Sequence, residues 1–90
     1  MYNSNMDADL TLKRRLDTTF FQIIDLDAGQ RKDLQHMWRN ARRIWELMDQ
    51  EMVYCRRQKK PTPKYQDFEK QLLLSLDTIE QYITFGLLTK

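Results

Sequence analysis

The longest regular pattern in the chain lies in residues 34–55, which read LQHMWRNARRIWELMDQEMVYC. Apolar residues recur here at alternating spacings of four and three positions: Leu34, Trp38, Ala41, Trp45, Met48, Met52 and Cys55. Such a heptad repeat forms one apolar stripe along a single face of an α-helix. The pattern predicts an all-α protein with a long helix at about 28–57, which would measure ~45 Å at ~1.5 Å per residue.

Start and stop signals flank this helix and define a second one. Asp27 stands three residues before Gln30, which is the spacing of a capping box and predicts a helix start near residue 28. Thr62-Pro63 predicts an N-cap followed by the first residue of another helix, and Gly86 is placed to end that helix after about residue 85. Because the connection between the two helices is short, 28–57 and 62–85 are expected to form a long antiparallel hairpin.

A shorter helix is expected upstream, at about 9–24. Leu12, Leu16, Phe20 and Ile23 fall on one helical face. A strand is the alternative for residues 18–24, which are rich in β-branched and aromatic side chains. Nothing else in the chain offers a strand partner, which favours a helix that braces the hairpin. Residues 1–8 are mostly polar and show no period, so we expect a flexible arm followed by a single helical domain at 9–90.

The composition excludes several classes of protein. The chain has 90 residues, of which 41% are hydrophobic and 31% charged, with two glycines and two prolines. These values are those of one globular domain and not of a collagen-like or low-complexity chain. There is no long apolar run, so neither a membrane span nor a signal peptide is expected. A single cysteine allows no internal disulfide, which predicts a cytoplasmic protein.

Some large apolar residues lie outside the predicted stripes. The core of the hairpin is expected to contain Trp38, Trp45, Phe68, Leu72 and Ile79. The residues left outside it are Leu47, Val53 and Tyr54 in the first helix of the hairpin, and Leu74, Tyr82 and Phe85 in the second. Either the short helix or another chain covers these side chains, or they are the scattered surface hydrophobic residues that are normal in soluble proteins. Because the core of so small a domain is marginal, we expect a homodimer with Leu74, Tyr82 and Phe85 as its assembly surface; a different protein partner is the other expectation.

Positive charge is concentrated in the middle of the chain. The net charge is +2, yet residues 31–64 hold 10 Lys and Arg against 4 Asp and Glu. One group lies on a face of the long helix and comprises Lys32, Arg39, Arg42 and Arg43; another lies at the turn and comprises Arg56, Arg57, Lys59 and Lys60. Such rows can contact the phosphates of a nucleic acid. The alternative is a solvated helix end, where Lys and Arg favour the negative pole of the helix dipole.

Catalytic and metal-binding motifs are not found in the sequence. His36 and Cys55 are 19 positions apart, or ~28 Å along one helix, so they cannot act as a pair within the chain. There is no Gly-rich phosphate loop and no Cys/His cluster. We therefore expect no enzyme activity, no cofactor and no metal.

The expected function is that of a small helical interaction or adaptor protein that acts through helix–helix packing. Its size and composition are also typical of accessory proteins of phages and mobile elements. The alternative is a nucleic-acid-binding accessory protein that uses the basic helix face and the Arg56–Lys60 turn.

Overall fold

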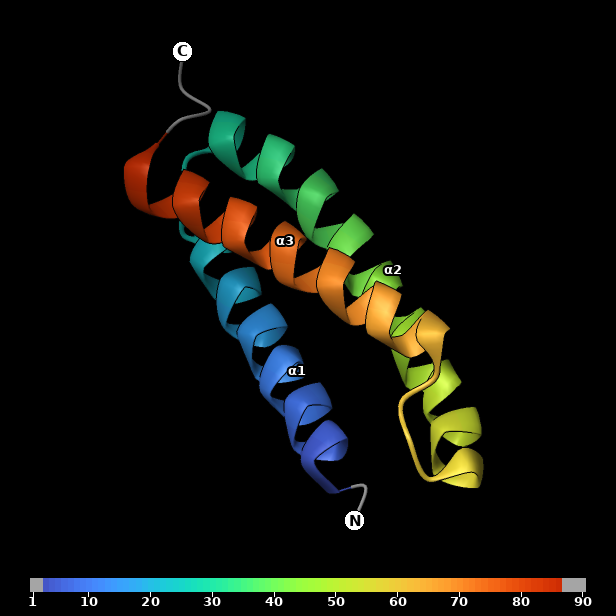
Figure 1. Cartoon of the computed structure of the whole chain (residues 1–90). Helices are drawn as coiled ribbons and strands as arrows, with labels where there is room; N and C mark the ends of the chain where they lie inside the picture. The colour runs from blue at the N-terminus through green and yellow to red at the C-terminus, as the bar shows by residue number, and fades with distance from the viewer. Residues whose placement is uncertain (1–2, 87–90) are drawn as a thin grey trace.

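Three helices make up the computed structural model: α1 (Asn3–Ile24), α2 (Ala28–Gln58) and α3 (Pro63–Phe85) (Figure 1). The structure describes the backbone of residues 3–86 and the side chains of residues 10–86. The prediction of an all-α fold is confirmed, and residues 18–24 are helical. The molecule is elongated, with extents of 46 × 17 × 17 Å.

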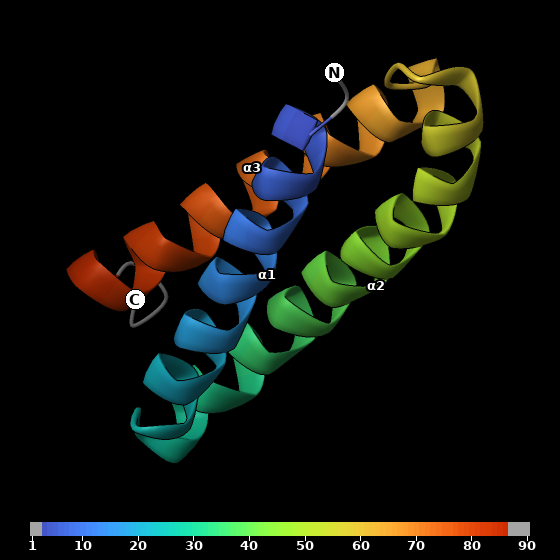
Figure 2. The ribbon, with the colours of Figure 1, turned by 90° about the horizontal axis from the view of Figure 1, so that it is seen from below.

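The second and third helices form an antiparallel hairpin, and α1 packs along one side of it (Figures 1 and 2). Helix α2 ends at Gln58, one residue beyond the predicted end, and α3 begins at Pro63, one residue after the start of the predicted range 62–85, and ends as predicted. Helix α1 begins at Asn3 and not near residue 9, so residues 3–8 continue the helix where the sequence suggested an irregular arm.

Both predicted N-caps are present. The Asp27 side chain accepts a hydrogen bond from the Gln30 backbone N–H at 3.1 Å. The Thr62 hydroxyl accepts from the Tyr65 backbone N–H at 3.1 Å and donates to the Glu51 carboxylate at 2.8 Å. This hydroxyl therefore begins α3 and also ties that helix to α2 across the turn.

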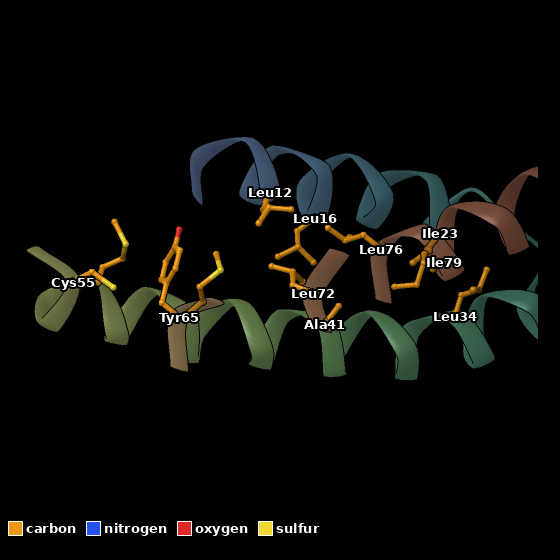
Figure 3. Packing of buried hydrophobic residues seen from close by; sticks show 12 residues of the cluster. Leu12, Leu16, Ile23, Leu34, Ala41, Cys55, Tyr65, Leu72, Leu76 and Ile79 are labelled. Atoms are coloured by element: carbon orange, nitrogen blue, oxygen red, sulfur yellow. The ribbon is translucent and has the colours of Figure 1, made fainter. Parts of the chain in front are cut away.

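One apolar cluster lies between the three helices (Figure 3). Its buried members are Leu12, Leu16, Ile23, Leu34, Ala41, Met48, Met52, Cys55, Tyr65, Leu72, Leu76 and Ile79. The expected core residues Leu72 and Ile79 are fully buried, whereas Trp38, Trp45 and Phe68 only lie partly buried against the cluster. The two tryptophans of the heptad stripe are therefore at its edge.

The buried face of α1 differs by one position from the predicted face. Thr19 is buried, while Phe20 is 38% exposed. The Thr19 hydroxyl can be buried because it donates to the Leu16 carbonyl at 2.9 Å, within its own helix. Phe20 is consequently turned toward the edge where α1 meets α2.

Polar contacts fix α1 against both helices of the hairpin. The Trp38 Nε1–H donates to the Leu16 carbonyl at 2.8 Å. The Arg15 guanidinium donates to both carboxylate oxygens of Glu80, at 2.8 and 3.2 Å, and to Asp77 at 2.9 Å. The hydrogen bond to Glu80 is the main reason why the pKa of Arg15 lies above its ordinary value, and Arg15 therefore stays charged.

The end of α2 contains a conformational strain that a substitution can relieve. Lys59 caps the helix with a φ of 58° in the left-handed region, which a glycine adopts without the steric cost that a Cβ brings. We expect Lys59→Gly to raise the free energy of unfolding by about 0.5–1 kcal/mol. Urea denaturation followed by circular dichroism measures this change, and a destabilised variant would contradict it.

Candidate functional site: an aromatic groove and an apolar rear face

The residue types that most often carry chemistry are dispersed in this fold. His36 is exposed on α2, whereas Cys55 is a buried free thiol on the same helix. Across the described side chains, no three His, Cys, Asp or Glu residues gather to form a metal site. None of the helices, over the residues described, has the length and apolar character needed to cross a membrane. What the structure does show is two surfaces of exposed apolar side chains.

The first surface is a groove where α1 meets α2, which we call the aromatic groove. It has a volume of about 360 Å³ and is lined by Asp17, Phe20, Phe21, Trp38 and Arg42. The ring centroids of Phe20 and Trp38 are 5.0 Å apart, and those of Phe20 and Phe21 are 5.8 Å apart. Phe21 is 64% exposed, so one ring of this cluster faces solvent.

Cations border the aromatic groove on the α2 side. The Arg42 guanidinium lies 5.8 Å from the centre of the Trp38 ring, within the range of a cation–π interaction. Arg42 also lies 3.7 Å from Glu46, a long and exposed ion pair that contributes little. On the α1 side, Asp17 is neutralised by Lys13 at 2.9 Å. The charged side chains at the edge of the groove therefore form two pairs of opposite sign.

The structure separates the two basic groups that the sequence suggested. All eight side chains are exposed: Lys32, Arg39, Arg42, Arg43, Arg56, Arg57, Lys59 and Lys60. The first four lie in the first half of α2, where Arg42 lines the aromatic groove and the other three lie on the outer face of the helix. The other four lie at the hairpin turn, ~20 Å further along the helix from Arg43, and Glu46 and Asp49 stand between the groups. They do not form one continuous surface.

The second surface lies between α2 and α3, away from the contacts of α1, and we call it the rear face. It comprises Met37, Ile44, Leu47 and Tyr54 of α2, together with Phe68, Leu74, Tyr82 and Phe85 of α3. A hollow of about 280 Å³ between Met37 and Leu74 marks its centre and is also lined by Asn40, Ser75 and Thr78. The exposed fractions of Leu74 and Phe85 are 62% and 69%.

The predicted assembly residues divide into two kinds. Leu74 and Phe85 are exposed, while Tyr82 is half-buried and packs against the core. Helix α1 covers none of Leu47, Tyr54 and Leu74, which remain 40%, 53% and 62% exposed. The sequence alone does not show whether the short helix or another chain covers these apolar side chains. In the structure, α1 does not cover them.

The aromatic groove is the feature that sequence reasoning missed. Phe20 was assigned to the buried face of its helix, and Trp38 to the core. A helical wheel shows on which side of its own helix each of these residues lies. It does not show that the fold places the Phe20 side of α1 against the Trp38 side of α2. The cluster of Thr18-Thr19-Phe20-Phe21 was a signal that this segment carries more aromatic surface than one buried face needs.

Comparison of the chain with protein-family models, with curated proteins and with solved structures finds no match. The class that the structure defines is that of a three-helix protein with an antiparallel hairpin.

Proposed function

We propose that the protein is a non-enzymatic helical interaction protein that acts through helix–helix packing and associates with a second copy of itself through the rear face. The observation that carries this proposal is the exposure of large apolar side chains along both helices of the hairpin. A three-helix fold buries only the side of the hairpin that α1 covers. A second pair of helices on the other side would complete a four-helix arrangement.

The chemistry of the rear face favours a second copy as its occupant. The polar side chains at its centre, Asn40, Ser75 and Thr78, are uncharged, and the acidic Glu51 is already hydrogen-bonded to Thr62. Two copies related by a twofold axis place the same patch on both sides of the contact, so a patch with few charges meets itself without repulsion. Core size supports this too, because a domain of 90 residues buries a smaller fraction of its surface than a larger domain does.

The cytoplasm is the compartment that we propose. Cys55 is a free, buried thiol, which suits a reducing environment.

A double substitution on the rear face tests the proposal. The wild-type protein should sediment with twice its chain mass of 11.0 kDa, and the variant Leu74→Glu/Phe85→Glu should sediment as a monomer. The reason is that a carboxylate buried in an apolar contact without a partner costs several kcal/mol. Both side chains are mostly exposed in the single chain, so the substitutions leave the fold of each copy intact.

Leu10→Glu provides the matched control, because Leu10 is 59% exposed on α1 and lies outside the rear face. Sedimentation equilibrium over a range of concentrations measures all three masses. A monomeric wild-type protein, or a variant that keeps the mass of the dimer, would show that the rear face does not bind a second copy.

A further inference from the structure

We infer that the aromatic groove and the adjacent basic face of α2 form a binding site for single-stranded nucleic acid. The inference concerns a different surface from the rear face, and it does not depend on self-association. It rests on three observations: exposed rings, unpaired cations on the adjoining outer face of α2, and a concentration of positive charge in the first half of that helix that the helix dipole does not explain.

The rings are arranged so that an unpaired base can stack on them. Phe20 and Trp38 form a tilted pair, and Phe21 lies edge-on to Phe20 with an interplanar angle of 78°. Phe21 is 64% exposed, and the groove beside it has room for a planar ring. Aromatic side chains bind the faces of bases with little regard to sequence, which requires bases that are not already stacked in a duplex.

Arg42 is the cation that lines the groove, and it pairs with Glu46, but the other cations in this half of α2 lack acidic partners. Lys32, Arg39 and Arg43 are exposed on the outer face of α2, and the structure pairs none of them with a carboxylate among the residues that it describes. From Lys32 to Arg43 this row spans ~16 Å of helix, which matches a segment of a few nucleotides. A positively charged row beside stacking rings is the arrangement that binds single strands.

Helix stability explains the basic turn but not this row. Arg56 and Arg57 lie in the last turn of α2, where the helix dipole favours positive charge. Lys32 lies near the start of the same helix, where the dipole favours negative charge; its neighbour Arg31 is explained by a hydrogen bond that it donates to the Ile24 carbonyl at the end of α1, at 3.4 Å. Residues 32–43 nevertheless carry four Lys and Arg and only one acid, Asp33. A ligand with negative charge accounts for this placement.

The charges elsewhere in the molecule favour one side of it for binding of a polyanion. Helix α3 carries four acids, Asp67, Glu69, Asp77 and Glu80, against two lysines, Lys64 and Lys70. The carboxylates Asp77 and Glu80 are bound to Arg15 where α1 meets α3. A polyanion is therefore repelled from the α3 side and attracted to the side where α1 meets α2.

Fluorescence anisotropy with labelled oligothymidylate of about 12 nucleotides tests the inference, because single-strand sites have about this length. If three phosphates are contacted, a fourfold increase in salt weakens binding about 20-fold, since each contact contributes about −0.7 to the logarithmic slope for single strands. The triple variant Lys32→Gln/Arg39→Gln/Arg43→Gln should lose this salt dependence and most of the binding. Its control is Arg56→Gln/Arg57→Gln/Lys60→Gln, which removes the same charge at the turn and should bind much more tightly.

A single substitution tests the contribution of the rings. Phe21→Ala should weaken binding at least fivefold, the lower limit for loss of one stacked base. Leu10→Ala is the matched control, because Leu10 is similarly exposed on the same helix and lies three turns from Phe21. In the background of Trp45→Phe, Trp38 is the sole tryptophan, and its emission should be quenched when the oligonucleotide binds.

Four results would overturn the inference. They are absence of binding at low salt, tighter binding of a duplex than of a single strand, equal loss in the two triple variants, and an unchanged affinity for Phe21→Ala. Inorganic polyphosphate separates base stacking from simple anion binding, because it carries phosphates without bases. Displacement of the oligonucleotide by polyphosphate at equal phosphate concentration would also contradict the proposed site.

Discussion

Leu16→Ala is expected to lower the free energy of unfolding by about 3–5 kcal/mol, the range for a fully buried leucine whose removal leaves a cavity. Leu16 is 1% exposed and lies beside Leu72 and Leu76 of α3, where all three helices meet (Figure 3). A domain of this size has a total stability of roughly 5–13 kcal/mol. The substitution therefore removes a large fraction of what holds α1 to the hairpin.

Urea denaturation followed by circular dichroism measures the loss, and hydrogen exchange locates it. The amide protons of α1 should exchange faster than those of α2 and α3. Leu10→Ala removes the same atoms from a residue that is 59% exposed, so it should change the stability by less than about 0.5 kcal/mol. Equal losses in the two variants would show that Leu16 does not lie in the core described above.

Tyr65→Ala should have an effect of similar size, about 3–5 kcal/mol, at the other end of the molecule. Tyr65 is fully buried in the first turn of α3 and lies near Cys55 at the hairpin end of the cluster (Figure 3). Its ring is a fully buried member of the apolar cluster. The backbone cap remains in the variant, because Thr62 accepts from the N–H of residue 65 and not from its side chain.

The helices whose amide protons exchange faster distinguish this variant from Leu16→Ala. Exchange should accelerate at the end of α2 and the start of α3, whereas α1 should remain protected. Val53→Ala is the control, since Val53 is 54% exposed near the same end of α2 and lies outside the rear face. A stability that is unchanged in Tyr65→Ala, or lowered equally in the control, would contradict the buried placement of Tyr65.

The bounds of α2 and α3 could be predicted because their signals are local. Asp27, Thr62-Pro63 and Gly86 act on backbone groups within a few residues, and the structure confirms Asp27 and Thr62 as N-caps and Gly86 as the C-cap. The heptad stripe similarly identified the buried residues Leu34, Ala41 and Met48. These features depend on the sequence of one helix at a time.

The features that were not predicted depend on how α1 meets the hairpin. Whether Thr19 or Phe20 is buried depends on the angle at which α1 lies against two neighbours, and a shift of one residue turns a helical face by ~100°. That rotation brings Phe20 against Trp38, so the aromatic groove forms from residues 18 positions apart in the chain. No pattern within either segment indicates this contact.

The number of helices also determines how the molecule bears a mechanical load. Over the residues that the structure describes, α1 begins near one end of the long axis and α3 ends near the other (Figure 1). A force applied between residues 3 and 85 therefore pulls along the 46 Å axis and slides α1 past α3. The bonds from Arg15 to Asp77 and Glu80 lie across that sliding plane and must break together with the leucine contacts of α1. Tension between the two ends therefore acts on the fold as a shear force. The contacts between α1 and the other helices resist this force together and not one after another.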